Sequence, residues 1–317
     1  MAKSSPIPFY KQMIALLRNT FVLFDEQGRV EVLRFILQNQ NPDGGFHDRG
    51  GRSDLYYSLF GMMILKAAQS KGQGAGSKEQ GSGSNQKRED RKERKANMAL
   101  APYSKHVDQA ILKLKQFIVR QKRAEVPGFI EYCCLVLLQK ELRVKRYSRL
   151  KSLFSLGRLF MKERHSINVS YRSFVLFVTL NAVFPFPSIF KAMLKKMLTK
   201  TKVDQQSPCS EVAAEVFLVK LLNYDGAEEQ ELLISFALES GGFKAFSHLA
   251  NADMLSTAVA LFALSYSGRD IRLIMPSCLD FIQQNYSEGA FLPGDGDRSA
   301  DIEYTFYGLL ALGILTN

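Results

Sequence analysis

The chain has 317 residues, of which 46% are hydrophobic, and it carries a formal net charge of +11 at pH 7. The apolar content suffices for a sizeable core, yet no apolar run reaches the roughly 18 residues that a bilayer-spanning helix needs. The first residues do not combine a charged start, an apolar segment and a small-residue cleavage site, so we expect a cytoplasmic protein. The positive charge favours an anionic partner such as nucleic acid, anionic lipid or phosphate.

The first predicted boundary between two helices lies between Gln38 and Gly61. The stretch from Asn41 to Phe46 contains a glycine turn, which is typical of a helix end followed by a loop. Asp54 then precedes an apolar run, and an aspartate in that place is typical of a helix N-cap. We therefore expect an apolar helix to begin near Asp54.

The next segment interrupts this pattern. Between residues 68 and 101 the composition changes to Gly, Ser, Lys, Gln, Glu and Arg. Such a segment cannot bury enough apolar surface to offset the entropy lost on ordering it. We interpret residues 68–101 as a disordered insertion within one domain, which is formed by residues 1–67 and 102–317.

Helical patterns of two kinds alternate after the insertion. Val107 to Lys122 predicts an amphipathic helix, whereas Glu131, Tyr171 and Glu211 each open an apolar run. An apolar run without a polar face belongs in the interior. The alternation therefore predicts pairs made of one surface helix and one buried helix.

The glycine-turn phrase returns twice towards the C-terminus, first before Asp253 and then before Asp301. Phe243 and Phe291 lie 48 residues apart in these two phrases, and so do the two aspartates. A fixed period of this size indicates a repeat architecture, in which each helical hairpin buries its apolar face against its neighbours.

Together the repeats predict an all-α fold, an α/α toroid of about six helical hairpins. The amphipathic helices would form the outer ring and the apolar helices the inner ring. An open solenoid is the alternative arrangement. The inner helices are expected to begin near Asp54, Glu131, Tyr171, Glu211, Asp253 and Asp301.

The stretch from Pro42 to Phe46, with Asp54 to Tyr57, resembles the repeat of protein prenyltransferase β subunits and of squalene and hopene cyclases. The resemblance covers almost the whole chain outside the insertion. It implies a toroid that handles an isoprenoid or another long lipid in a central apolar cavity.

The resemblance also identifies the positions at which prenyltransferases hold zinc, through an Asp and a Cys two residues apart and a His on a later helix. The matching residues are Asp253, Leu255 and Tyr304. One carboxylate cannot hold zinc, which needs three or four ligands. We therefore expect neither a metal ion nor a cofactor.

Asp253 to Ala258 also resembles the DxDDTA motif of the cyclases, whose central acid protonates an alkene. Leu255 and Ser256 replace the two later acids. The resemblance thus implies a cyclase-like chemistry only if another acid serves as the proton donor. Asp295 and Asp297, in a glycine-containing loop, are one alternative.

Three aspartates are expected at one end of the barrel, because Asp54, Asp253 and Asp301 each open an inner helix. N-capping explains their residue type, since a carboxylate accepts the free amide hydrogens of the first turn. A catalytic role at a polar pocket mouth, shared with Tyr304, is compatible with capping.

Basic and aromatic residues accompany the same helix starts. By resemblance, Arg49, Arg52 and Arg298 would bind an isoprenoid diphosphate, and arginine forks suit phosphate oxygens. Ion pairs with neighbouring aspartates are the alternative. The aromatic residues expected to contact a substrate, with ordinary core packing as the alternative, are Tyr56, Tyr57 and Tyr307.

A basic amphipathic region extends from Leu142 to Arg164, and the apolar stretch from Phe184 to Phe190 is followed by lysines. Attachment to the inner face of an anionic membrane and a solvated basic surface both explain this pattern. Nucleic acid is a weaker expectation, because no nucleic-acid motif accompanies the charge.

The sequence thus predicts a divergent toroid that handles an isoprenoid or lipid-like ligand without the zinc site or the cyclase acid, leaning towards an enzyme. The alternative is a noncatalytic toroid that binds a lipid or a helical protein partner. The four cysteines are expected to be buried, reduced thiols.

Overall fold

The computed structural model describes residues 8–69, 103–121, 126, 128–145, 148–163, 168–183, 191–192, 194–196 and 202–316. The predicted insertion at 68–101 therefore lies outside the described residues, except for its first two. The stretch from Phe184 to Phe190 lies outside them as well. None of the helices described is both long and apolar enough to cross a bilayer.

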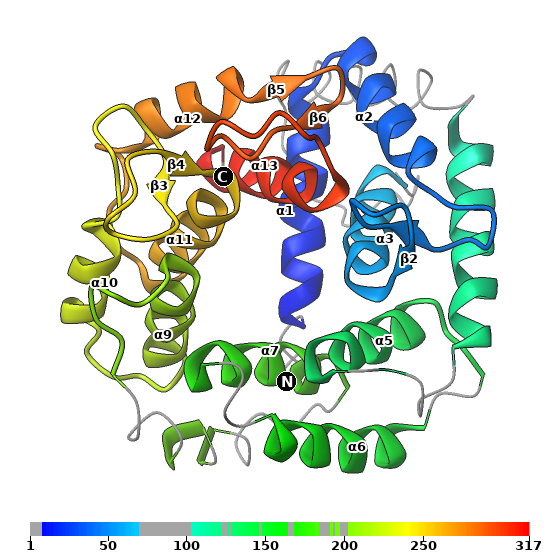
Figure 1. Cartoon of the computed structure of the whole chain (residues 1–317), viewed down its shortest axis with the longest axis horizontal. Helices are drawn as coiled ribbons and strands as arrows, with labels where there is room; N and C mark the ends of the chain where they lie inside the picture. The colour runs from blue at the N-terminus through cyan, green and yellow to red at the C-terminus, as the bar shows by residue number, and fades with distance from the viewer. Residues whose placement is uncertain are drawn as a thin grey trace, which may run out of the picture.

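Six of the described helices form the inner ring of a toroid (Figure 1). Each packs against the next around the ring, and the last packs against the first. This closure confirms the toroid and excludes the open solenoid. The inner helices are α3 (Leu55–Ala68), α5 (Phe129–Glu141), α7 (Val169–Val183), α9 (Cys209–Leu221), α11 (Met254–Ser267) and α13 (Ile302–Leu315).

Amphipathic helices surround this ring on its outside (Figure 1). They include a helix at 103–120, where the sequence predicts an amphipathic helix. Their apolar residues face the inner ring and most of their charged residues face solvent. Arg29 of α2 is an exception, because it is buried and donates to the carbonyls of Phe21 and Val22. The other described outer helices are α2 (Glu26–Gln38), α6 (Arg149–Lys162), α10 (Ala227–Ile234) and α12 (Met275–Gln284).

The three glycine-turn phrases fold in the same way. Each forms an antiparallel pair of two-residue strands just before an inner helix. The amide of the phrase's phenylalanine donates a hydrogen bond to a hydroxyl one turn into that helix, as from Phe291 to Thr305 at 3.2 Å. The pairs are β1 (Phe46–His47) with β2 (Ser53–Asp54), β3 (Phe243–Lys244) with β4 (Ala252–Asp253), and β5 (Tyr286–Ser287) with β6 (Ala290–Phe291).

One glycine in each phrase abuts the backbone of the next outer helix around the ring. Gly44 lies against Lys113, and Gly241 lies against Ser277. Gly289, in the last phrase, lies against Glu31 of α2, which belongs to the first hairpin. All three glycines have positive φ, and a Cβ at any of them would overlap backbone atoms. Neighbouring hairpins therefore meet at the repeat glycine. At the ring closure, the last hairpin meets the first at Gly289.

Helix α1 (Phe9–Leu23) was not expected from the repeats, and it crosses one end of the ring (Figure 1). It packs against α13, α3 and α7. The Thr20 hydroxyl donates to the Leu309 carbonyl at 2.7 Å, and the backbone of Leu16 lies against Gly313. These partners lie in the C-terminal half of α13, so α1 closes the end of the barrel at which the inner helices finish.

Candidate functional site

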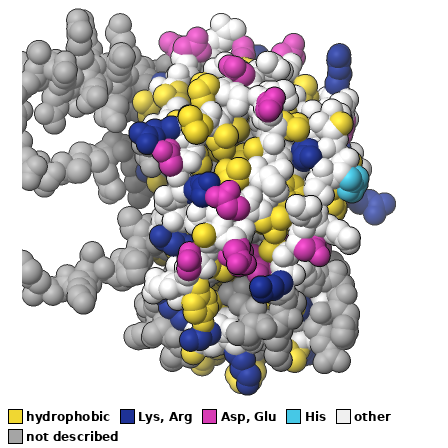
Figure 2. All heavy atoms as spheres, turned by 90° about the vertical axis from the view of Figure 1, so that its left-hand side faces the viewer, with side chains coloured by type: hydrophobic (Ala, Val, Ile, Leu, Met, Phe, Trp, Pro, Cys, Tyr) yellow, Lys and Arg dark blue, Asp and Glu magenta, His cyan; other side chains and the backbone are white. Residues whose placement is uncertain are grey.

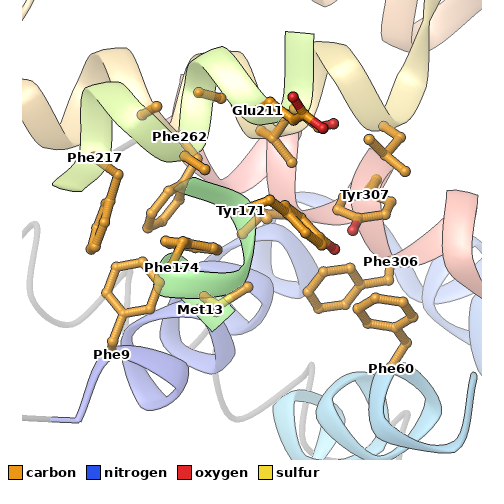
Figure 3. A pocket seen from close by; sticks show the side chains of 17 residues that line it. Phe9, Met13, Phe60, Tyr171, Phe174, Glu211, Phe217, Phe262, Phe306 and Tyr307 are labelled. Carbon is orange, nitrogen blue, oxygen red and sulfur yellow. The ribbon is translucent and has the colours of Figure 1, made fainter. Parts of the chain in front are cut away.

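A cavity of about 320 Å³ lies at the centre of the ring (Figure 3). Its lining comes from α1 and from five inner helices, α3, α7, α9, α11 and α13. Its volume is at the lower end of the range of about 300–1,000 Å³ that is usual for small-molecule pockets. The inner barrel is therefore hollow rather than filled by side chains.

Aromatic rings wall most of the cavity, and its polar groups are gathered near the starts of the inner helices (Figure 3). Phe9 of α1 lies at the apolar end and makes edge-on contacts with Phe217 and Phe262, at ring-centroid distances of 4.6 and 5.1 Å. The hydroxyl of Tyr171 and the carboxyl group of Glu211 lie at the other end, near the starts of α7 and α9. An elongated apolar ligand with one polar end matches this lining.

A second, more open pocket of about 350 Å³ lies at the starts of the inner helices. Tyr171 lines both pockets and so lies between them. The other residues of the outer pocket are largely polar. They are Asp48, Asp54, Tyr56, Tyr57, Ile130 and Glu131.

Glu303, on the first turn of α13, accepts hydrogen bonds from two tyrosines that line the outer pocket. The Tyr56 hydroxyl donates to it at 2.8 Å, and the Tyr57 hydroxyl lies 3.4 Å from its other oxygen. Burial raises the pKa of Glu303 to about 6, although the hydrogen bonds from the tyrosines oppose that shift. The carboxyl group can therefore hold a proton at mildly acidic pH.

A short chain of hydroxyl groups leads from Glu303 to the central cavity. The Tyr56 hydroxyl lies 3.4 Å from the hydroxyl of Tyr307, and the Tyr307 side chain lines the cavity (Figure 3). Burial raises the pKa of both tyrosines, so both keep their protons. The arrangement can hold a proton on Glu303 and pass it to the cavity wall.

The three predicted aspartates cap inner helices. Asp54 accepts from the Tyr56 amide at 2.7 Å, Asp253 from the Ser256 amide at 2.7 Å, and Asp301 from the Tyr304 amide at 2.8 Å. Burial raises the pKa of Asp253, against hydrogen bonds from Ser256 and Tyr304. Of the three, Asp54 lines the outer pocket, and the other two line neither pocket described above.

Arg49 joins the first hairpin to the last. Its Nε donates to Asp301 at 2.7 Å, and its Nη1 donates to Asp297 at 2.6 Å. Its guanidinium also lies 5.3 Å from the centre of the Tyr304 ring. Hydrogen bonds from Arg49 to the two carboxylates raise its pKa further. The side chain thus forms a charged link across the ring closure.

The predicted site residues therefore fall into groups. Arg49, Asp301 and Tyr304 lie together, and Tyr304 also acts to lower the pKa of Asp253. The three remaining tyrosines, Tyr56, Tyr57 and Tyr307, gather around Glu303. Arg52 and Arg298 are exposed.

Sequence reasoning missed Glu303 and the contribution of α1 to the cavity. A signal for Glu303 was present, because the second residue after the capping aspartate is Tyr56 and Leu255 in the sister repeats. An acid at a position that is otherwise aromatic or aliphatic is a departure from the repeat. No comparable signal existed for Phe9, because α1 lies outside the repeated pattern.

The described residues include no group of three or more His, Cys, Asp or Glu side chains that could hold a metal ion. All four cysteines are buried and unbridged, as the sequence predicts. Burial raises the pKa of the Cys133 thiol to about 12, so this thiol is not a reactive thiolate.

Comparison with known proteins agrees with the class that the fold defines, the α/α toroids. The family model for the prenyltransferase alpha-alpha toroid domain matches residues 13–101 and 192–317, more than half of the chain. The chain therefore belongs to the prenyltransferase alpha-alpha toroid domain family. No curated protein and no solved structure gave a match.

Proposed function

We propose that this toroid binds an uncharged isoprenoid, or a similar long-chain lipid, in its central cavity. The observation that carries the proposal is the cavity itself, which is walled largely by aromatic side chains and has polar groups near the starts of the inner helices. Burial of a hydrocarbon chain there is favourable by about 25 cal/mol per Å² of apolar surface removed from water. The polar end of the ligand would lie beside Tyr171 and Glu211.

The charges around the polar end favour an uncharged head group over a diphosphate. Inner-helix N-termini attract anions, yet Asp54, Asp253 and Asp301 already accept the amides of three of them. Arg49 is held by two carboxylates, and Glu211 lines the cavity. A diphosphate would meet these negative charges at short range. We therefore place the polar end of the ligand on the tyrosines rather than on the arginines.

The experiment compares ligands on the purified protein by titration calorimetry, with a C15 isoprenoid alcohol and its diphosphate as probes. We expect the alcohol to bind more tightly than the diphosphate. Val259→Phe, which fills part of the cavity, should weaken alcohol binding at least roughly tenfold, because the added ring occupies the ligand's space. Val22→Phe, on the exposed face of α1, is the matched control.

Two outcomes would contradict this proposal. Tighter binding of the diphosphate would indicate that the arginines, rather than the tyrosines, bind the head group. Unchanged alcohol binding by Val259→Phe would place the ligand elsewhere. Mass spectrometry of lipids extracted from the purified protein would identify the natural ligand.

A second candidate function, acid-initiated rearrangement of the bound ligand, is favoured by the chain of groups from Glu303 through Tyr56 to Tyr307. Addition of a proton to an alkene carbon gives a cation, which the aromatic walls would stabilise. Loss of a proton from a neighbouring carbon then restores an alkene and returns a proton to the acid. The same residues would bind the lipid without reaction if no proton were transferred.

Deuterium labelling distinguishes reaction from binding alone. In D2O we expect deuterium on the carbon skeleton of a C15 isoprenoid alcohol, detected by mass spectrometry. The rate should fall as the pH rises through about 6, because the protonated form of Glu303 is the donor. Glu303→Gln should lower the rate on the order of 100-fold while the alcohol still binds. Binding of the alcohol without incorporation of deuterium would contradict the acid-initiated reaction and would support binding alone.

A further inference from the structure

Helix α6, on the outer ring, exposes a row of large apolar side chains. Leu150, Phe154 and Met161 are 69%, 81% and 63% exposed. Their spacing of four and seven residues places them on one face of the helix. Gly157, three residues after Phe154 and four before Met161, lies on the same face, and nothing would contact a Cβ there. The opposite face packs on the ring through Leu156 and Phe160, so the exposed row has no partner among the described residues.

The exposed charges on α6 are all positive. The helix contains no acidic residue, and the nearest acid, Glu163, accepts a hydrogen bond from the Phe129 amide. The segment before the helix adds exposed Arg143 and Lys145. The basic side chains of α6 itself are all exposed, and they are Arg149, Lys151, Arg158 and Lys162.

This combination distinguishes α6 from α10, another helix of the outer ring. Figure 2 shows the side of the molecule that carries α10, where acidic and basic side chains are interspersed. The sequence of α10 has three glutamates and no basic residue. The surface of α6 therefore differs in both charge and apolar exposure from the side that carries α10.

We propose that α6 attaches this protein to the surface of a membrane that contains anionic lipids. The helix would lie in the plane of the interface, with the apolar row between the lipid head groups. The flanking lysines and arginines would contact lipid phosphates and carboxylates, because their charge complements that of the surface. A bilayer fits this face because it offers an apolar layer beneath an anionic one. The proposal does not depend on the ligand in the central cavity.

The test is co-sedimentation of the full chain with phosphatidylcholine vesicles, with and without phosphatidylserine. We expect binding to the anionic vesicles that weakens as salt is added. The triple variant Leu150→Ser, Phe154→Ser, Met161→Ser should bind at least roughly tenfold more weakly, because it removes the inserted side chains. The triple variant Lys151→Gln, Arg158→Gln, Lys162→Gln should lose the preference for anionic vesicles.

Leu273→Ser is the matched control, because Leu273 is 97% exposed and lies outside α6. It should bind vesicles like the unaltered protein. All variants change exposed side chains, and thermal unfolding should confirm that they remain folded.

Three results would overturn the proposal. These are equal binding to neutral and anionic vesicles, full binding by the apolar triple variant, and a failure of the unaltered protein to bind vesicles. Self-association that the apolar triple variant abolishes, without vesicle binding, would assign the row to a second copy of the chain. The same variants should also be titrated with the C15 isoprenoid alcohol in solution. Unchanged alcohol binding would show that a loss of vesicle binding does not come from the central cavity.

Discussion

Replacement of Gly289 by alanine is expected to destabilise the ring at its closure. Gly289 has φ +86°, and a Cβ there would overlap the backbone of Glu31 and Val32. The left-handed conformation costs a non-glycine residue about 1–2 kcal/mol, and overpacking against a backbone adds about 1–3 kcal/mol. We expect the free energy of unfolding, measured with urea, to fall by about 2–5 kcal/mol.

The control for this prediction is Gly296→Ala. Gly296 has φ +106°, and nothing lies within 4 Å of a Cβ at that position. Its substitution should therefore carry the backbone cost alone, about 1–2 kcal/mol. Equal losses for the two variants would show that close approach at Gly289 does not hold the ring closed.

Replacement of Phe9 by alanine is expected to have an effect of similar size at the other end of the barrel. The ring is 3% exposed and contacts aromatic rings of α7, α9 and α11. Its removal forfeits the burial of a large side chain and enlarges the adjoining cavity. Substitutions of this kind cost about 3–5 kcal/mol. Urea unfolding measures the loss.

Val22→Ala in the same helix provides the comparison, because Val22 is 62% exposed. It should change the free energy of unfolding by no more than about 0.5 kcal/mol. A loss below about 1 kcal/mol for Phe9→Ala would mean that α1 contributes little to closing the barrel.

The toroid could be predicted because its repeats are local. A glycine turn, a capping aspartate and an apolar run lie within about 20 residues of one another, and each has its own physical reason. Asp54, Asp253 and Asp301 therefore marked the starts of α3, α11 and α13 correctly. Even the weaker starts at Glu131, Tyr171 and Glu211 fall within the first turns of α5, α7 and α9.

The details of the site depend on pairings that repetition does not specify. Arg49 was expected to bind a diphosphate or, alternatively, to pair with a neighbouring aspartate, and it pairs with Asp301, 252 residues away. Ring closure makes that contact, and a residue's own repeat says nothing about its partner across the closure. Glu303 likewise accepts its hydrogen bonds from tyrosines on α3, the first inner helix, while burial rather than these bonds raises its pKa. Single-repeat reasoning therefore placed the helices better than the side chains between them.

The position of α1 has a consequence for the order in which the chain folds during synthesis. Thr20 and its partner Leu309 are 289 residues apart, so α1 leaves the ribosome long before α13 is made. Until then the part of its apolar face that packs on α13 has no native partner, and exposed surface of this kind promotes aggregation. Contacts of such long sequence separation also form slowly. The nascent chain should therefore depend on chaperones until its last hairpin emerges, and truncation within α13 should leave the first helix unprotected from proteases.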